Sequence, residues 1–356
     1  MLTSSLGILN YSRRLIREFS GMPDPGFNLV ILVSGGNRDL FVSPPLPPWM
    51  SVGELPGPAR GTGARRLWCD HVEVLRAARR HQARLIHFPK GWLPFRKPRG
   101  MRFMATLHDA IPEYEARHHP GHTRPGKRMY FSWAIRHSLR LADRILTDSD
   151  ASRAHLSALV PEAAHKIQPL WIGPGISSRP PSGTRDSLLV LGSRQPHKAT
   201  RQTLHLLAAW SARTPSPPPV RITGLSGWPV EWGPAPILPS ATWLGRVSDD
   251  QMAGEYGRAR ALVFLSEIEG FGLPALEAVL AGAAVCYRNV SSVGELMQGA
   301  PGGWDGLSDS GFPAALEESL AAPQAVWDQV KSRLARDCRW DLAARKTLDE
   351  YRKMLD

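Results

Sequence analysis

At 356 residues the chain exceeds what one hydrophobic core usually supports, so two domains of ordinary size are expected. With 42% hydrophobic and 21% charged residues, no run of 18 apolar residues and no basic-then-apolar start, it is predicted to be a folded protein that is neither secreted nor membrane-spanning. Its net charge of +12 favours anionic partners, and its three widely spaced cysteines fit a reducing cytoplasm and exclude a disulfide framework.

Short apolar runs alternate with longer helical patterns, which is typical of an open parallel α/β sheet. In the first half of the chain, the predicted strands are 27–33, 85–88, 103–107, 144–146 and 166–169. The chain passes from Met1 directly into a helix-like run, so the strand that normally opens a doubly wound domain is missing. We hypothesise a truncated or misassigned start, which mass spectrometry of the native protein would test.

The series of strands restarts after a Pro/Ser/Gly-rich segment at 173–183, which is predicted to be a linker. The strands predicted for the second half are 187–191, 220–223, 242–244, 261–265 and 283–287, and a helix is predicted over 342–354. This pattern divides the chain into an N-terminal domain (1–178), a C-terminal domain (179–338) and a terminal helix (339–356).

The most informative stretch is SEIEGFGLPALEAVLAGAAV, which begins at Ser266. It follows a predicted strand, and Gly270, Gly272 and Pro274 form a turn that opens a helix. Backbone amides at such a helix start can donate to hydroxyls or to a diphosphate. Glu269 in the turn and Glu277 in the helix are therefore expected to face one cleft, although acidic residues at a helix start also simply complement its dipole.

EGFGLPALE resembles the E-x7-E motif of retaining glycosyltransferases, particularly family 4 of that class. The resemblance implies a GT-B fold, in which two Rossmann-like parallel-sheet domains face a central cleft and the C-terminal helix crosses back to the N-terminal domain. It also implies that Glu277 binds the nucleotide ribose. The donor-binding turn would be Gly270 to Leu273, where Glu269 and the amides of Phe271, Gly272 and Leu273 hold the transferred sugar.

Two further segments are similar to loops of the same family. LGSRQPHKA, which ends at Ala199, is similar to the G-x-x-x-P-x-K loop that meets the donor diphosphate, and this implies that Lys198 and Arg194 bind the donor. His197 and Ala199 depart from the usual Arg and Asn. The segment Thr106-Leu107-His108-Asp109 contains a pair that resembles the family's His-Asp dipeptide. His108 would then contact the donor sugar, and Asp109 would orient it or line the acceptor side.

Weaker similarities concern five more residues. LGRVSD corresponds to a loop near the nucleobase and contains Val247, and SSVGEL resembles a segment in which Glu295 would be a site residue. Gly7 is the remaining candidate for the glycine loop that normally follows the first strand. In TDSDAS, Asp148 or Ser149 is expected to cap a helix.

These assignments imply a reaction that needs no metal and no cofactor. Lys198, Arg194 and the glycine-rich amides would stabilise the departing nucleotide diphosphate. By resemblance, a hexose is transferred with retained configuration to a glycan or lipid-linked acceptor in O-antigen, capsule or exopolysaccharide biosynthesis. GDP-mannose is the first expectation for the donor, and a UDP-sugar the second.

The positive charge is concentrated in residues 51–140, which hold 18 Lys or Arg against 6 Asp or Glu. Such a block attracts phosphorylated acceptors, acidic lipid or nucleic acid, although an Arg-rich soluble surface has the same composition. No nucleic-acid module is recognisable in it. Trp92 and Phe95 lie near Lys90 and Arg96, which favours a loop that faces lipid or acceptor on the inner surface of the plasma membrane.

Two alternatives stay open. Asp148-Ser149-Asp150 has the D-x-D form of metal-dependent transferases, but helix capping explains it better. A catalytically degenerate paralogue could act as a nucleotide-sugar or anionic-membrane binding protein; the absent first strand favours this alternative, whereas the retained Lys198 argues against it. Donor binding without turnover would identify such a paralogue.

Overall fold

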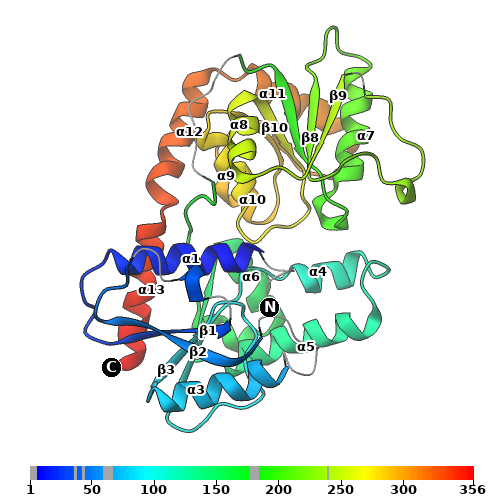
Figure 1. Cartoon of the computed structure of the whole chain (residues 1–356). Helices are drawn as coiled ribbons and strands as arrows, with labels where there is room; N and C mark the ends of the chain where they lie inside the picture. Colours follow the sequence, from blue (N-terminus) through cyan, green and yellow to red (C-terminus); the bar gives the residue numbers. More distant parts are fainter. Residues whose placement is uncertain (1–5, 36–37, 42–44, 59–66, 177–183, 239) are drawn as a thin grey trace.

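The computed structural model describes residues 6–35, 38–41, 45–58, 67–176, 184–238 and 240–356. Figure 1 shows two α/β halves stacked one above the other, with α12 and α13 running down one side of both. The predicted domain boundary at 178 falls on residues 177–183, which lie outside the described part of the chain. The boundary therefore stays a prediction.

The N-terminal half contains two parallel sheets. One has two strands, β1 (Leu29–Gly35) and β2 (Met50–Pro58), and the other has the four strands β3 (Leu85–Phe88), β4 (Arg102–Thr106), β5 (Arg144–Thr147) and β6 (Ile167–Pro169) in chain order. The helices of this half are α1 (Leu6–Ser20), the π-helix η2 (Cys69–Glu73), α3 (Val74–Arg80), α4 (Ile111–His118), α5 (Pro125–Leu141) and α6 (Asp150–Leu159).

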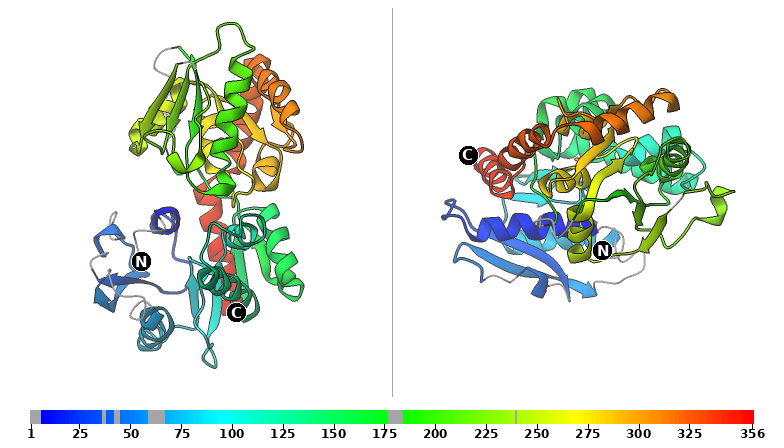
Figure 2. Two further views of the ribbon diagram at one scale, coloured as in Figure 1. Left: turned by 90° about the vertical axis from the view of Figure 1, so that its right-hand side faces the viewer. Right: turned by 90° about the horizontal axis from the view of Figure 1, so that it is seen from above.

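The two sheets of this half stand apart, as Figure 2 shows in its left view. A doubly wound sheet in the usual order places its first strand between the second and the fourth. The described part of the chain begins with α1, and no strand of that part lies between β1 and β3 in sheet order. β2 was not predicted, because Gly53, Pro56 and Pro58 interrupt its apolar run. It pairs with β1 alone, and such an edge position tolerates proline.

The C-terminal half has one parallel sheet of six strands in the order β12-β11-β10-β7-β8-β9. Its strands are β7 (Ser187–Leu191), β8 (Val220–Thr223), β9 (Ala241–Gly245), β10 (Ala259–Phe264), β11 (Ala284–Arg288) and β12 (Gly303–Trp304). Its helices are α7 (Thr200–Ser211), α8 (Asp249–Arg258), α9 (Leu273–Leu280), α10 (Ser291–Leu296), α11 (Phe312–Ala321) and α12 (Gln324–Asp337). Apart from the two-residue β12, these strands lie where the apolar runs predict them.

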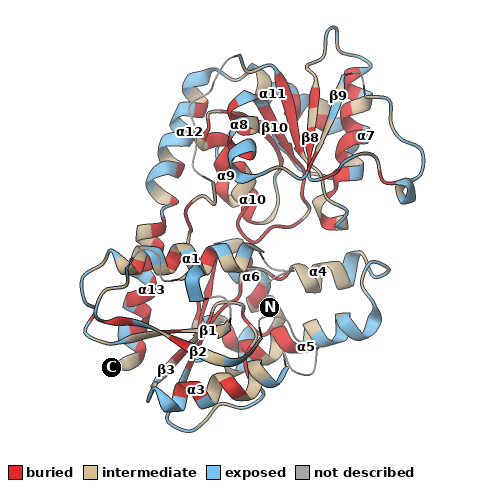
Figure 3. Ribbon diagram, viewed as in Figure 1, coloured by how far each residue is buried: buried red, intermediate tan, exposed pale blue. Residues whose placement is uncertain are grey.

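Both halves bury apolar residues between sheet and helices (Figure 3). The central strand β10 is buried at every position except Arg260, as is typical of a parallel strand covered by helices on both faces. In the N-terminal half, Phe103 and Ile145 on the neighbouring strands β4 and β5 are fully buried. The carboxyl ends of β4 and β10 carry the loops that form the candidate site.

The last helix, α13 (Trp340–Leu355), returns to the N-terminal half and packs on α1. Tyr351 contacts Phe19 and Phe27 edge to face, and its hydroxyl is 2.6 Å from His87 Nδ1. Trp340 donates to the Pro174 carbonyl at 2.9 Å. The predicted return of the terminal helix onto the N-terminal half is therefore confirmed.

Candidate active site

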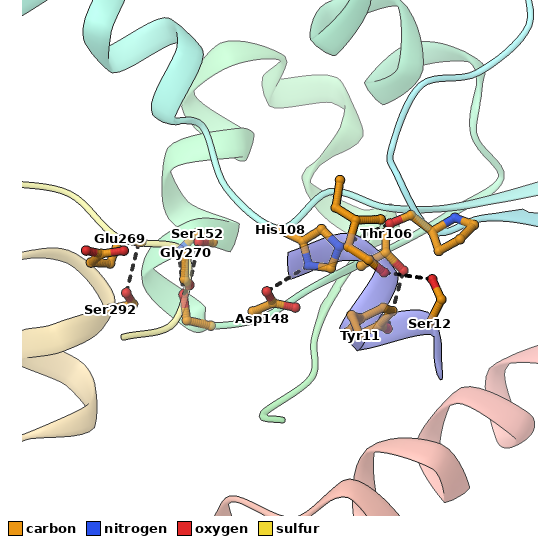
Figure 4. A network of polar contacts seen from close by, with 12 residues as sticks. Tyr11, Ser12, Thr106, His108, Asp148, Ser152, Glu269, Gly270 and Ser292 are labelled. Carbon is orange, nitrogen blue, oxygen red and sulfur yellow. Dashed lines mark hydrogen bonds and ion pairs between the residues drawn. The ribbon is translucent and has the colours of Figure 1, made fainter. Parts of the chain in front are cut away.

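The loop that follows β10 lies directly against the loop that follows β4 (Figure 4). A Cβ atom on Gly270 would be 2.8 Å from the His108 carbonyl oxygen and 3.2 Å from Asp109 Cβ. The Gly270 carbonyl accepts hydrogen bonds from the hydroxyls of Ser149, at 2.8 Å, and Ser152, at 3.0 Å. Glycine at 270 thus lets the two halves meet at the residues that were predicted to hold the sugar.

Glu269 and Lys198 form an ion pair within the C-terminal half. Lys198 Nζ donates to Glu269 Oε1 at 2.6 Å, and Glu269 is buried. The Glu269 backbone is fixed as well, because its amide donates to Ser291 Oγ at 3.2 Å and its carbonyl accepts from Ser292 Oγ at 2.9 Å. The lysine belongs to the loop after β7 and the glutamate to the loop after β10, so the structure brings two predicted donor-binding residues together.

Glu277 lies in the first turns of α9 and is buried. Its Oε1 accepts from the amides of Gly175, at 2.8 Å, and Ile176, at 3.0 Å, and its Oε2 accepts from the Tyr256 hydroxyl at 3.0 Å. Burial raises the pKa of Glu277 to about 7, although these hydrogen bonds and the charge of Arg14 oppose the rise. This carboxyl group can therefore change its charge near neutral pH.

The turn before α9 has the backbone geometry that the glycine pattern predicts. Gly272 is the N-terminal cap of α9 and has a φ of +96°, which a residue with a side chain rarely adopts. A Cβ atom there would also be 3.1 Å from Val293 Cγ2. Phe271 is buried and contacts Trp171 edge to face, whereas Leu273 is half-buried. The amides of this turn open the helix and point away from its carboxyl end.

His108 is held by Asp148 and by a backbone carbonyl. Its Nδ1 lies 2.8 Å from Asp148 Oδ2, and its Nε2 lies 3.1 Å from the Pro89 carbonyl oxygen. Burial lowers the pKa of His108, but the charge and hydrogen bond of Asp148, with smaller effects of Asp109 and Pro89, outweigh it and raise the pKa. Burial also raises the pKa of Asp109, although the hydrogen bond from the Ile111 amide opposes this rise.

Of the two residues expected to cap α6, only Ser149 does so: its hydroxyl accepts from the Ser152 amide at 3.0 Å. Asp148 instead partners His108, while the exposed Asp150 lies 3.9 Å from Arg153. The two carboxylates of the D-x-D sequence thus have different partners. Nowhere in the described ranges do three His, Cys, Asp or Glu side chains group as metal ligands.

Four other candidates have different surroundings. The Arg194 side chain is 66% exposed and pairs with Glu231 at 3.0 Å. Val247 packs on the C-terminal core, and Gly7 is exposed in the first turn of α1. Glu295 accepts from the amides at the start of α6, at 3.1 and 2.8 Å, and from Trp171. The predicted donor contacts of Arg194, Val247 and Gly7 stay predictions, and so does the site role of Glu295.

Several residues of the site were not predicted. Tyr256 and the amide of Gly175 reach Glu277 from more than twenty residues away in sequence, and no local pattern marks them. Asp148 was singled out, but as a helix cap. Glu115, which contacts the opposite half, lay outside every motif, and Glu267 lay within the stretch that begins at Ser266 but was given no role.

Sequence comparison gives the same assignment to both halves of the chain. A "Glycosyltransferase Family 4" model matches residues 7–170, and a "Glycosyl transferases group 1" model matches 236–304. The chain belongs to the family 4, group 1 glycosyltransferases. The O-antigen chain mannosyltransferase B of Escherichia coli is 30% identical over 243 residues, which cover 62% of this chain and 61% of that protein.

A second relative of this glycosyltransferase is the serotype-specific mannosyltransferase WbdA of Escherichia coli, 28% identical over 209 residues. The match covers 51% of this chain and 25% of that protein, so the chain spans less than two thirds of either relative.

Solved structures agree on the fold. Sucrose-phosphate synthase from Thermosynechococcus elongatus superposes with a TM-score of 0.67 at 17% identity, over 97% of this chain and 92% of that one. Anabaena HepE in complex with UDP and glucose superposes with a TM-score of 0.63 at 14% identity, over 98% and 96%. The predicted GT-B fold is confirmed.

Proposed function

We propose that this glycosyltransferase is a retaining, metal-independent hexosyltransferase. It would move mannose from a nucleotide-sugar donor to a glycan or lipid-linked acceptor in the synthesis of a bacterial surface polysaccharide. The mannosyltransferase relatives support the choice of sugar, and GDP-mannose is therefore the first candidate donor. A UDP-sugar is the second, since the related fold of HepE is seen with UDP and glucose.

The observation that carries this proposal is the meeting of the two halves at Gly270. On one side lie His108 and its partner Asp148, and on the other lie Lys198 and Glu269. A diphosphate placed beside Lys198 would replace Glu269 as the anionic partner of the ammonium group. The lysine would then stabilise the charge that develops on the leaving diphosphate, with no need for an ion.

His108 and Glu269 would act on the sugar in this scheme. His108 would donate from Nε2 to a sugar hydroxyl in place of the Pro89 carbonyl, while Asp148 keeps its Nδ1. Glu269, once its lysine turns to the diphosphate, can accept from sugar hydroxyls. Asp109 would line the acceptor side. These roles are proposals, as are those of Arg194, Val247 and Gly7 in donor binding.

Calorimetric titration of the purified chain with GDP, UDP and ADP tests the donor site. We expect one nucleotide to bind with the same affinity with and without EDTA. Glu277→Gln should weaken this binding about tenfold, because a charged acceptor for the ribose hydroxyls is lost. In the unaltered chain, affinity should also rise between about pH 6 and pH 8 as Glu277 ionises, and the difference from the variant should grow over that range.

A matched control is Glu162→Gln, since that glutamate is 63% exposed and pairs with Arg140 of α5. No binding of any nucleotide by the folded chain would contradict the proposal. Binding that disappears with EDTA would contradict its metal-independent form. Binding of the intact donor without any turnover on acceptors would instead identify a degenerate, binding-only protein.

The proposal includes peripheral attachment to the inner face of the plasma membrane. None of the described helices has the length and apolar character to span a bilayer. Figure 3 shows exposed residues along α5. Three of its large apolar side chains are exposed, and so is that of Phe95, which lies against one of them; we call these four residues the apolar patch: Phe95, Met129, Tyr130 and Trp133. The rings of Phe95 and Trp133 are 5.7 Å apart. Exposed cations lie close in sequence to these residues: Arg96, Arg99, Arg124 and Lys127.

Co-sedimentation with vesicles tests this attachment. The chain should bind vesicles that contain anionic lipid more strongly than neutral ones, and binding should weaken as salt is raised because exposed charges are screened. Trp133→Ser should reduce binding, whereas Leu307→Ser, a change at an even more exposed apolar residue of the C-terminal half, should not. Absence of binding, or binding that salt does not weaken, would argue against a membrane partner.

A further inference from the structure

Helix α4 contacts the C-terminal half through a pair formed by the partly buried carboxylate of Glu115 and the buried imidazole of His197. Glu115 Oε1 lies 2.7 Å from His197 Nδ1, and the His197 side chain is only 2% exposed. A buried polar ring costs free energy unless it is hydrogen-bonded, so this contact fixes the place of His197. Because His197 immediately precedes Lys198, Glu115 acts on the donor loop from the opposite half of the molecule.

A second contact lies beside the first. Glu267 Oε2 is 2.6 Å from His119 Nε2 and 3.3 Å from the Tyr114 hydroxyl. The Glu267 amide also donates to the His197 carbonyl at 2.7 Å. The two contacts are therefore connected, and α4 with the residue that follows it holds the loop after β7 and the loop after β10 at the same time.

The loop that carries Lys198 has a strained backbone. Ala199 has a φ of +50°, in the left-handed region, where a residue with a side chain is strained by about 1–2 kcal/mol. Such a conformation persists only where the surroundings hold it. Glu115 supplies one of the contacts that hold this loop, and the loop in turn directs Lys198 toward Glu269.

Helix α4 also starts at the sugar-facing dipeptide. Asp109 Oδ1 accepts from the Ile111 amide at 2.9 Å, which fixes the first turn of the helix. One short helix thus connects His108 and Asp109, at its start, with the Lys198 loop, which its Glu115 contacts. A separation of the two halves would break the contact of Glu115 with His197 and leave the lysine loop only its contacts within the C-terminal half, such as that of the Glu267 amide with the His197 carbonyl.

We infer that Glu115 is a positioning residue, which fixes Lys198 through His197 when the two halves close over the donor. The inference rests on the proposed function, since it requires that Lys198 contacts the donor diphosphate. In this proposal Glu115 contacts the His197 imidazole and acts on the donor only through it. Its loss should therefore affect turnover, which needs the lysine in one place in the transition state, more than simple binding of the nucleotide.

The test compares turnover with nucleotide binding in variants of the full chain. Glu115→Ala should lower kcat about tenfold or more, with a change in the Kd of the nucleotide of less than about threefold. Glu115→Gln should retain most of the activity, because its amide oxygen can still accept from His197. The control is Glu113→Ala on the same helix, whose carboxylate contacts Ser132 and lies 3.6 Å from Arg136, both within the N-terminal half.

Each outcome separates the inference from the proposed function. If the unaltered chain binds no nucleotide, the proposed function itself fails. If the chain binds and turns over its donor and Glu115→Ala is as active as Glu113→Ala, the inference alone is overturned. Equal losses in the glutamine and alanine variants would also overturn it. Should Glu115→Ala not fold, Glu115→Asp, which shortens the side chain by one methylene, replaces it in the same comparison.

Discussion

Lys198→Met is expected to lower kcat for sugar transfer by about 10²- to 10³-fold while the chain stays folded. The reason is that the ammonium group, now 2.6 Å from Glu269, is the cation of the cluster that can meet the charge of a departing diphosphate. Methionine keeps most of the length of the side chain and removes only its charge. Steady-state kinetics with saturating donor measure the effect, and thermal unfolding checks the fold.

Two further variants make the Lys198 result interpretable. Lys331→Met applies the same exchange to an exposed lysine on α12, and its kcat should stay within about twofold of the unaltered chain. Lys198→Arg keeps the positive charge but changes its shape, so it should recover part of the loss. Retention of more than about a third of the activity by Lys198→Met would show that another group neutralises the diphosphate.

Gly270→Ala is expected to reduce kcat by about a hundredfold, because a displacement of reacting groups by about 1 Å has effects of this size. The added methyl group would be 2.8 Å from the His108 backbone oxygen, which has no flexible end that can move aside. The turn that is proposed to hold the sugar must therefore shift away from His108 and Asp109. Steady-state kinetics measure the loss of activity, and the unfolding temperature of the same preparation shows whether the chain stays folded.

Gly254→Ala is the matched control for this prediction. Gly254 lies inside α8, and a Cβ atom there would have no neighbour within 4 Å. Alanine in a helix interior is more stable than glycine by about 0.5–1 kcal/mol, so this variant should unfold at a slightly higher temperature with unchanged activity. If Gly270→Ala were as active as Gly254→Ala, the close contact between the two halves would have no part in the reaction.

The sequence was sufficient to predict the parts of the fold that local patterns govern. Buried parallel strands such as β7 and β10 are continuous apolar runs, and they were placed within about two residues. β2 was missed because its glycine and prolines have the composition of a loop, and only its pairing with β1 makes it a strand. Pairing of this kind is not visible in a local window of sequence.

The candidate site divides in the same way. Glu269, Gly270 and Lys198 could be found because they lie in segments that resemble the motifs of family 4 glycosyltransferases, at the carboxyl ends of predicted strands. The partner of His108 could not be found in this way. Asp148 lies forty residues further on, and its position at the start of a helix made it a candidate helix cap instead. The contact of Glu115 with His197 joins the two halves across 82 residues, and only their packing brings these side chains together.

The packing of α13 on the N-terminal half has a consequence for the order in which the protein can mature on the ribosome. Domains generally fold as they emerge, N-terminal first. Here the isolated pair β1 and β2 is too small to be stable alone. The aromatic cover over Phe19 and Phe27 comes from Tyr351, which is synthesised more than three hundred residues later. The segment that contains Phe19 and Phe27 must therefore wait for α13 before it reaches its final packing.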